Sequence, residues 1–212
     1  MTIGERLRNS YKRKIAMDKV RRVRSLLHSG YQRMILGRRL HGMPVLRIHL
    51  GCGEIDDPRF LNVDARPFRH VHYVTHSPLM PALPAGRADM VYACHIFEHI
   101  SFIKQMAVLK RWHALLKPGG ELRLSVPDFE KLIGLHQRKE LGFRSIQNAL
   151  MGGQGYPENF HFALFTADHL TMLLTQAGFS NIRHWRASEQ DNWPRDWSWA
   201  EQLSLNLRAD KP

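Results

Sequence analysis

The chain has 212 residues, of which 43% are hydrophobic and 24% are charged. This composition is typical of a folded globular protein and excludes a disordered or membrane-embedded chain. The formal net charge of +12 is concentrated at one end, because residues 1–43 hold 12 Lys and Arg against Glu5 and Asp18. These residues therefore carry +10, and the rest of the chain carries only +2.

The absence of targeting signals and the number of cysteines indicate the cellular compartment of the protein. No apolar run approaches the ~20 residues of a membrane span, and residues 1–14 lack the apolar centre of a secretory signal peptide. Cys52 and Cys94 are too few for a disulfide framework, and neither lies in a CxxC or Cys/His ligand spacing. We therefore expect a cytoplasmic protein with reduced thiols and no bound metal.

The first 43 residues predict a basic amphipathic extension. Apolar residues recur at helical spacing, with Lys and Arg on the other faces; they are Leu7, Tyr11, Ile15, Val20, Val23, Leu27, Tyr31 and Met34. We expect one or two helices here, broken near Gly30, and a boundary at Gly42 and Pro44. Such helices suit the surface of an anionic membrane, although an Arg-rich start also resembles an organellar targeting peptide.

Residues 44–212 predict a separate α/β domain, in which short β-type runs alternate with helical stretches, as in parallel strands joined by crossovers. The predicted strands are 45–50, 60–63, 70–75, 90–94, 121–126, 181–187 and 202–208. The clearest predicted helices are 102–116 and 167–177, the second of which ends at Gly178 as a C-cap.

A glycine turn after the first predicted strand indicates a nucleoside site. The run Leu50-Gly51-Cys52-Gly53 lacks side chains where a nucleoside would lie against the backbone. Asp64 follows at the end of the second predicted strand, where a carboxylate can accept hydrogen bonds from both ribose hydroxyls. Asp56 occupies the third-glycine position of a dinucleotide fingerprint, so a cofactor without phosphates fits better.

Several motifs occur in an order that resembles the class I S-adenosylmethionine-dependent methyltransferases. They are Leu50-Gly51-Cys52-Gly53, Asn62-Val63-Asp64, Ala88-Asp89-Met90-Val91-Tyr92, Phe97-Glu98-His99-Ile100, Leu116-Lys117-Pro118-Gly119-Gly120-Glu121-Leu122 and Val126-Pro127-Asp128. Within that family the chain is most similar to small predicted methyltransferases of bacterial glycan gene clusters.

The resemblance implies a Rossmann-like, mostly parallel seven-stranded sheet in the order 3-2-1-4-5-7-6, with the last strand antiparallel. It also implies S-adenosyl-L-methionine as cofactor, with its methionine part at Leu50, Gly51, Cys52 and Gly53, its ribose at Asp64, and its sulfonium near His95. The sequence departs from the family at His49 and at Thr75-His76-Ser77, where acidic residues are frequent. The Lys-Pro-Gly-Gly segment is expected to be a structural turn entering the fifth strand.

Catalytic residues are expected at the carboxyl ends of the parallel strands. Methyl transfer needs an aligned acceptor and, for a hydroxyl, a group that removes its proton. Histidine is the best such base near neutral pH, so His99 and His161 are the candidate bases. His99 equally fits a role in bonding its helical neighbours.

Candidate acceptor-binding residues come from three places. Glu98 follows the fourth predicted strand, and Asp128 follows the fifth, where helix capping is an alternative role. Gln154 lies in the long insertion 129–162, which is typical of a lid or acceptor site. Trp193 and Trp197 lie in an aromatic loop that suits a sugar ring, or that closes a small satellite core.

Three functions remain open on the sequence alone. The first is methylation of a small hydroxylated acceptor, a sugar or lipid-linked glycan, with the basic extension on an anionic membrane surface. The second is methylation of RNA held by that extension, which the nearly neutral main domain disfavours. The third is a non-catalytic cofactor-binding scaffold.

Overall fold

The computed structural model of the chain describes residues 34, 36–187 and 194–212. Pro44–Pro212 form one compact unit, and the residues before Pro44 form a second one. In that second unit residues 36–41 are helical. The rest of the predicted basic helices, residues 5–33 and 35, lies outside the described residues.

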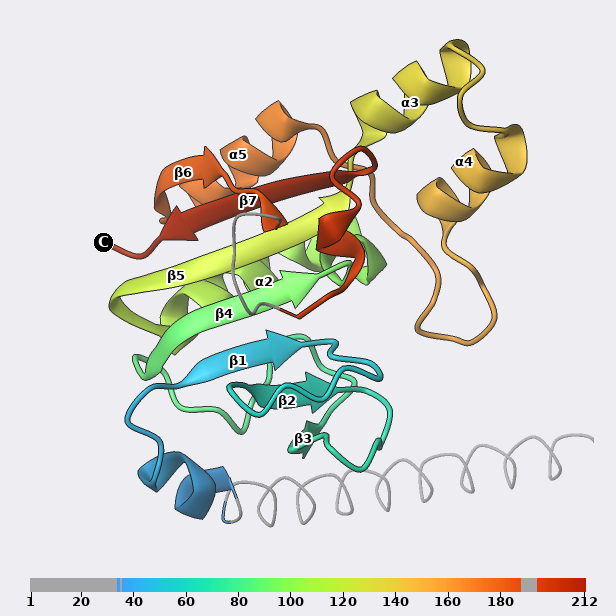
Figure 1. The fold of residues 1–212 in the computed structure, drawn as a ribbon. Coiled ribbons are helices and arrows are strands. Elements are labelled where there is room, and N and C mark those ends of the chain that lie inside the picture. The colour runs from blue at the N-terminus through green and yellow to red at the C-terminus, as the bar shows by residue number, and fades with distance from the viewer. Residues whose placement is uncertain (1–33, 35, 188–193) are drawn as a thin grey trace, which may run out of the picture. The chain divides into compact units, whose positions relative to one another are not determined.

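A seven-stranded sheet forms the centre of the larger unit, in the order β3-β2-β1-β4-β5-β7-β6 (Figure 1). Its strands are β1 (Arg47–Leu50), β2 (Leu61–Asp64), β3 (Tyr73–Val74), β4 (Ala88–Cys94), β5 (Leu116–Pro127), β6 (Ser180–His184) and β7 (Ser204–Asp210). Neighbours from β3 to β5 pair in parallel, and β7 pairs antiparallel with both β5 and β6. The expected strand order and the antiparallel last strand are confirmed.

The helices are α2 (Phe102–Leu115), α3 (Phe129–Gln137), α4 (Phe143–Met151) and α5 (Ala167–Gln176), with single 3₁₀ turns η1 (Phe97–His99) and η3 (Trp197–Trp199). Figure 1 shows α2 and α5 behind one face of the sheet, whereas α3 and α4 lie beyond the carboxyl end of β5. Among the described residues no helix combines the length and apolarity that crossing a bilayer requires.

Burial of the central strands on both faces explains their sequence. All four residues of β2 are buried, and so are six of the seven in β4. Fully buried parallel strands usually carry continuous apolar runs, as most of β4 does, whereas β2 also buries the polar residues Asn62 and Asp64. Trp112 of α2 is fully buried against Phe97, with ring centroids 5.6 Å apart, and its indole N–H donates to the Pro78 carbonyl at 2.9 Å.

Two predicted strands are shorter than expected, since β3 covers only Tyr73–Val74 and β6 ends at His184. Two further differences concern a helix and a turn. Helix α4 was not predicted, because its first residue follows Gly142, which provides no side-chain cap. The Lys-Pro-Gly-Gly segment belongs to the irregular start of β5 instead of preceding the strand, since Leu116 pairs with Ala88 before the register shifts. Gly119 has φ 74° there, and its amide donates to the Lys211 carbonyl at 2.9 Å.

Candidate active site

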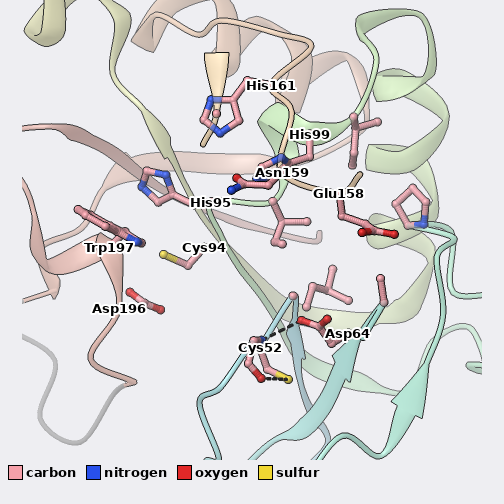
Figure 2. A pocket seen from close by; sticks show the side chains of 18 of the residues that line it. Cys52, Asp64, Cys94, His95, His99, Glu158, Asn159, His161, Asp196 and Trp197 are labelled. Carbon is pink, nitrogen blue, oxygen red and sulfur yellow. Dashed lines mark hydrogen bonds between the residues drawn. The ribbon is translucent and has the colours of Figure 1, made fainter. Parts of the chain in front are cut away.

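A cavity of about 1380 Å³ opens at the carboxyl ends of the parallel strands, where the order of the sheet reverses around β1 and β4. Nine residues selected from the sequence line it: Leu50, Gly51, Cys52, Gly53, Asp64, His95, His99, His161 and Trp197. Figure 2 shows Cys52 and Asp64 at one end of the cavity and His99 and His161 at the other. The predicted cofactor and base positions therefore share one space.

The glycine turn forms the backbone wall of the cavity. Gly51 and Gly53 have φ of 60° and 56°, a left-handed conformation that residues with a Cβ rarely adopt. A Cβ on Gly51 would lie 1.8 Å from the Cδ1 atom of Ile96, which is a severe overlap. The Cys52 amide donates to the Val63 carbonyl at 3.2 Å, which ties the turn to β2.

Asp64 lies at the end of β2 beside this turn. Its Oδ2 accepts a hydrogen bond from the Gly53 amide at 2.8 Å, and its Oδ1 accepts one from the Arg66 amide at 2.8 Å. An ionised carboxylate offers about four acceptor positions, of which these amides use two. The Arg66 Nε atom also lies 3.5 Å from Oδ1 as an ion-pair partner, beyond hydrogen-bond geometry, so positions remain for further donors. These residues therefore fit a nucleoside, whose two ribose hydroxyls supply two donors and whose bulk fits against glycine backbone.

The two cysteines take no part in nucleophilic chemistry. Burial raises the pKa of the Cys52 thiol to about 12, and the nearby Asp64 carboxylate adds to this. Burial also raises the pKa of Cys94 well above its ordinary value. Because the thiolate is the reactive form, both side chains stay inert near neutral pH.

His95 connects the end of β4 to the last strand. It has φ 51°, and its Nε2 lies 3.0 Å from the Ser204 hydroxyl, whose hydrogen is donated to the Trp197 carbonyl at 2.8 Å. His95 Nε2 is therefore the donor to Ser204. Its Nδ1 faces Oε1 of Glu98 at 3.1 Å, and its ring centroid lies 6.4 Å from that of Trp197.

His99 and His161 face each other with ring centroids 4.6 Å apart. The Nδ1 atom of His99 lies 3.1 Å from the Phe160 carbonyl, and that of His161 lies 3.0 Å from the Ala149 carbonyl. A carbonyl oxygen only accepts, so both Nδ1 atoms carry the hydrogen. In the neutral rings the Nε2 atoms are therefore free to accept a proton or bind a ligand.

Glu98 lies beneath the histidines and is completely buried. Burial by itself raises the pKa of Glu98, but the neighbouring His95, His99 and His161 outweigh it, so the pKa of Glu98 is lowered and the carboxylate is ionised. Burial is also the largest influence on His161, where it lowers the pKa despite the opposing effect of Glu98. His161 is thus a neutral base at pH 7.

The proposed acceptor residues are only partly brought together. Trp197 lines the cavity with 66% of its surface exposed, whereas Trp193 lies outside the described residues. Glu98 does not line the cavity, and its exposed fraction is 0%. The expectation that Glu98 contacts the acceptor directly therefore has no support in the geometry.

Two further acceptor candidates lie away from the cavity wall. Asp128 is buried, and its carboxylate accepts the Lys131 amide at 3.2 Å at the start of α3, so it has the alternative role of a helix cap. Gln154 is exposed, with its side-chain amide donating to the Met151 carbonyl at 3.2 Å. Neither position faces the space in which an acceptor would lie.

Sequence reasoning missed the residues that anchor the aromatic loop. Tyr92 donates from its hydroxyl to Oδ2 of Asp196 at 2.6 Å, and Oδ1 of Asp196 accepts the amide and hydroxyl hydrogens of Ser198. Asp196 lines the cavity beside Trp197. The tyrosine lies within an apolar strand and the aspartate in a loop, so no local signal joins residues this far apart.

A family model described as "Methyltransferase domain" matches residues 20–184. No curated protein sequence matches the chain.

Solved structures with the same fold have low sequence identity to the chain. A Burkholderia thailandensis 1,6-didemethyltoxoflavin-N1-methyltransferase, solved with 1,6-didemethyltoxoflavin and S-adenosylhomocysteine, is 19% identical with a TM-score of 0.52, over 96% of this chain and 89% of that one. An Archaeoglobus fulgidus SAM-dependent methyltransferase is 14% identical with a TM-score of 0.51, over 84% and 94%. A possible histamine N-methyltransferase from Thermotoga maritima is 17% identical with a TM-score of 0.50, over 98% of both chains.

Proposed function

Because the chain belongs to the methyltransferase domain family, we propose that it transfers a methyl group from S-adenosylmethionine to a hydroxyl group of a small acceptor, a sugar or lipid-linked glycan. The observation that carries the cofactor assignment is the free acceptor capacity of Asp64 beside the glycine turn. The observation that carries the acceptor assignment is the pair of histidines with free Nε2 atoms in the same cavity.

Asp64 and the glycine turn hold the cofactor. Asp64 binds the ribose hydroxyls through its two remaining acceptor positions, and Gly51 and Gly53 leave room for the methionine part. Bound there, S-adenosylmethionine supplies an electrophilic methyl carbon, and the electron pair of the broken carbon–sulfur bond stays on sulfur as the acceptor oxygen forms its new bond.

His99, His161 and Glu98 remove the acceptor proton. The hydroxyl proton passes to an Nε2 atom of the histidine pair, because both Nδ1 atoms already carry hydrogens that are bound to carbonyls. The buried Glu98 carboxylate, 3.9 Å from His161 Nε2, stabilises the resulting imidazolium. Trp197 exposes its ring at the cavity and offers a flat apolar surface to the hydrophobic face of a sugar.

The basic extension, residues 1–43, is the part of the chain that we expect to bind a macromolecular partner. With +10 on residues 1–43, we assign it to an anionic membrane surface on which a lipid-linked acceptor would be presented. RNA is the competing partner for the same charge.

Transfer of a labelled methyl group tests the proposed reaction. The protein is incubated with S-adenosylmethionine labelled in its methyl group and with separate pools of sugars, lipid-linked glycans, amines and RNA. We expect label in the sugar or lipid-linked pool. At least one of the variants His99→Asn and His161→Asn should lower kcat by about 10²–10⁴-fold, the usual contribution of a general base.

His136→Asn is the matched control, because this histidine also bonds a carbonyl, that of Leu141 at 3.2 Å, but does not line the cavity. It should leave kcat unchanged. Label found only in amines or RNA would contradict the proposed acceptor. Full activity of both cavity variants would contradict the proposed bases.

A further inference from the structure

Three electron-pair donors converge at the back of the cavity. One ligand atom from each of Glu98, His99 and His161 lies within 4.8 Å of the other two. Both histidines donate their Nδ1 hydrogens away from the group, to the Phe160 and Ala149 carbonyls. Their Nε2 atoms therefore bring lone pairs, and not hydrogens, to this histidine–carboxylate cluster (Glu98, His99 and His161).

The Glu98 carboxylate is completely buried, and its one close ion-pair partner in the described part of the chain, His95, approaches only one of its two oxygens. Its exposed fraction is 0%, and neither oxygen makes a well-directed hydrogen bond to another described residue. Two histidine nitrogens approach Oε1, which are His95 Nδ1 at 3.1 Å and His161 Nε2 at 3.9 Å. A buried ionised carboxylate is costly unless a positive charge compensates it, and His95 faces only one of its two oxygens.

The arrangement matches how proteins hold transition metals. Ligand atoms around an ion with bonds of about 2.1 Å lie roughly 3–4 Å apart, close to the 3.9 Å between His161 Nε2 and Glu98 Oε1. Metal-binding histidines usually donate their second ring hydrogen to a carbonyl or carboxylate, which fixes the ring and its tautomer. Both histidines of the cluster already do so.

We propose that Glu98, His99 and His161 bind a divalent transition-metal ion whose open coordination positions face the cavity. Two imidazoles and one carboxylate favour Zn²⁺, Fe²⁺ or Mn²⁺ over Mg²⁺ or Ca²⁺, which prefer oxygen ligands. Glu98 lies behind and the two histidines line the cavity, so the free positions open toward the acceptor.

The role of the ion rests on the proposed methyl transfer to a hydroxyl group, but it replaces the free Nε2 atoms as the means of removing the proton, because a ligated nitrogen cannot accept one. An acceptor hydroxyl bound at an open position would lose its proton more readily, because the ion stabilises the alkoxide. The oxygen then forms its bond to the methyl carbon, and the released proton leaves to solvent rather than to a ligated histidine. The cluster thus performs the same proton removal through the ion instead of through a free Nε2 atom.

Cobalt binding tests the site without any turnover. The full chain, free of affinity tag and stripped of metal with a chelator, is titrated with Co²⁺ and followed by visible absorption. We expect one equivalent to bind with the absorption of ligated cobalt, and Zn²⁺ to displace it. Glu98→Gln, His99→Asn and His161→Asn should each weaken binding by more than the ~10–100-fold that loss of a second-shell partner causes.

The controls distinguish a variant that has lost a metal-binding side chain from a variant that fails to fold. His136→Asn should bind Co²⁺ as the unchanged chain does, since His136 lies outside the cluster. Far-UV circular dichroism identifies any variant that fails to fold, and the partly exposed His99 keeps the test decisive if the buried Glu98→Gln variant unfolds. Absence of a cobalt spectrum, or equal affinity in the folded cluster variants, would overturn the metal site.

A titration of the same metal-free protein with S-adenosylhomocysteine distinguishes the two proposals. Cofactor binding without cobalt binding would overturn the metal site and leave the proposed function standing. Cobalt binding that depends on the cluster, in a protein that binds no S-adenosylhomocysteine, would support the metal site and overturn the proposed function.

Discussion

At the scale of single residues, one short hydrogen bond helps to shape the cofactor end of the cavity. The Gly53 amide donates to Asp64, which holds the glycine turn against the end of β2 and orients the carboxylate. This pair could be predicted from the sequence, because a glycine turn after a strand and an acid at the next strand tip are local features.

The buried position of Glu98 could not be predicted in the same way. Its surroundings come from His95 three residues earlier and from His161, which a long insertion brings back to the cavity. Sequence spacing shows that the insertion exists but not where it folds. Glu98 was therefore predicted as an acceptor contact, whereas in the structure it is completely buried and does not line the cavity.

His49 provides a prediction of pH-dependent stability. It is 1% exposed, between Phe60 and Tyr92, and burial lowers its pKa from 6.5 to about 4. Below pH 6.5 the unfolded chain binds a proton that the folded chain does not, so stability falls between pH 6.5 and 4. We expect this residue to make the free energy of unfolding about 2 kcal/mol smaller at pH 5 than at pH 7.

Denaturant unfolding at the two pH values measures the effect, and His49→Gln provides the comparison because it removes the titrating ring. The variant should lose about 2 kcal/mol of the pH dependence. An identical difference between pH 5 and pH 7 in both proteins would contradict the assignment.

At the scale of elements, β1, β2 and β4 position the site and were predicted within a few residues. The apolar run of β4 is typical of a strand buried on both faces, whereas β1 and β2 bury the polar residues His49, Asn62 and Asp64 as well. Helix α4 was not predicted because its nine residues carry few buried positions, with Ile146 as the buried one, and no side chain caps its start. It contacts α3, and the sequence does not reveal this tertiary contact.

Helix α3 provides a prediction about its cap. Asp128→Ala removes the acceptor for the Lys131 amide and should lower the free energy of unfolding by about 1 kcal/mol, with little effect on methyl transfer. Thr166→Ala is the matched control, because Thr166 caps α5 through the His169 amide at 3.2 Å. It should lower the free energy of unfolding by a similar amount. If Asp128→Ala left stability unchanged and abolished methyl transfer, the result would contradict the cap assignment and support a role of Asp128 in binding the acceptor.

At the scale of the whole molecule, charge and chemistry belong to different parts of the chain. The cavity lies within Pro44–Pro212, whereas residues 1–43 carry most of the net charge. The uneven distribution of charge could be read directly from the sequence, because counting charged residues requires no knowledge of the fold. It could not identify the acceptor, because acceptor recognition depends on side chains from separate loops.

Vesicle sedimentation of the full chain tests the partner of the basic extension. We expect the protein to sediment with phosphatidylglycerol vesicles and not with phosphatidylcholine vesicles. Binding should fall steeply between about 0.1 M and 1 M salt, over which the screening length shortens from ~10 Å to ~3 Å. Equal binding to both lipids, or a clear preference for RNA over the anionic vesicles, would contradict the membrane assignment.

The most direct test of the central claim is calorimetric titration of S-adenosylhomocysteine into the full chain and into Asp64→Ala. The account predicts one binding site in the unchanged protein and at least ~10-fold weaker binding in the variant, because two charge-assisted hydrogen bonds to ribose are lost. Asp128→Ala, which alters a helix cap outside the cavity wall, should bind the ligand normally. No binding to the unchanged protein, or equal affinity in Asp64→Ala, would contradict the account.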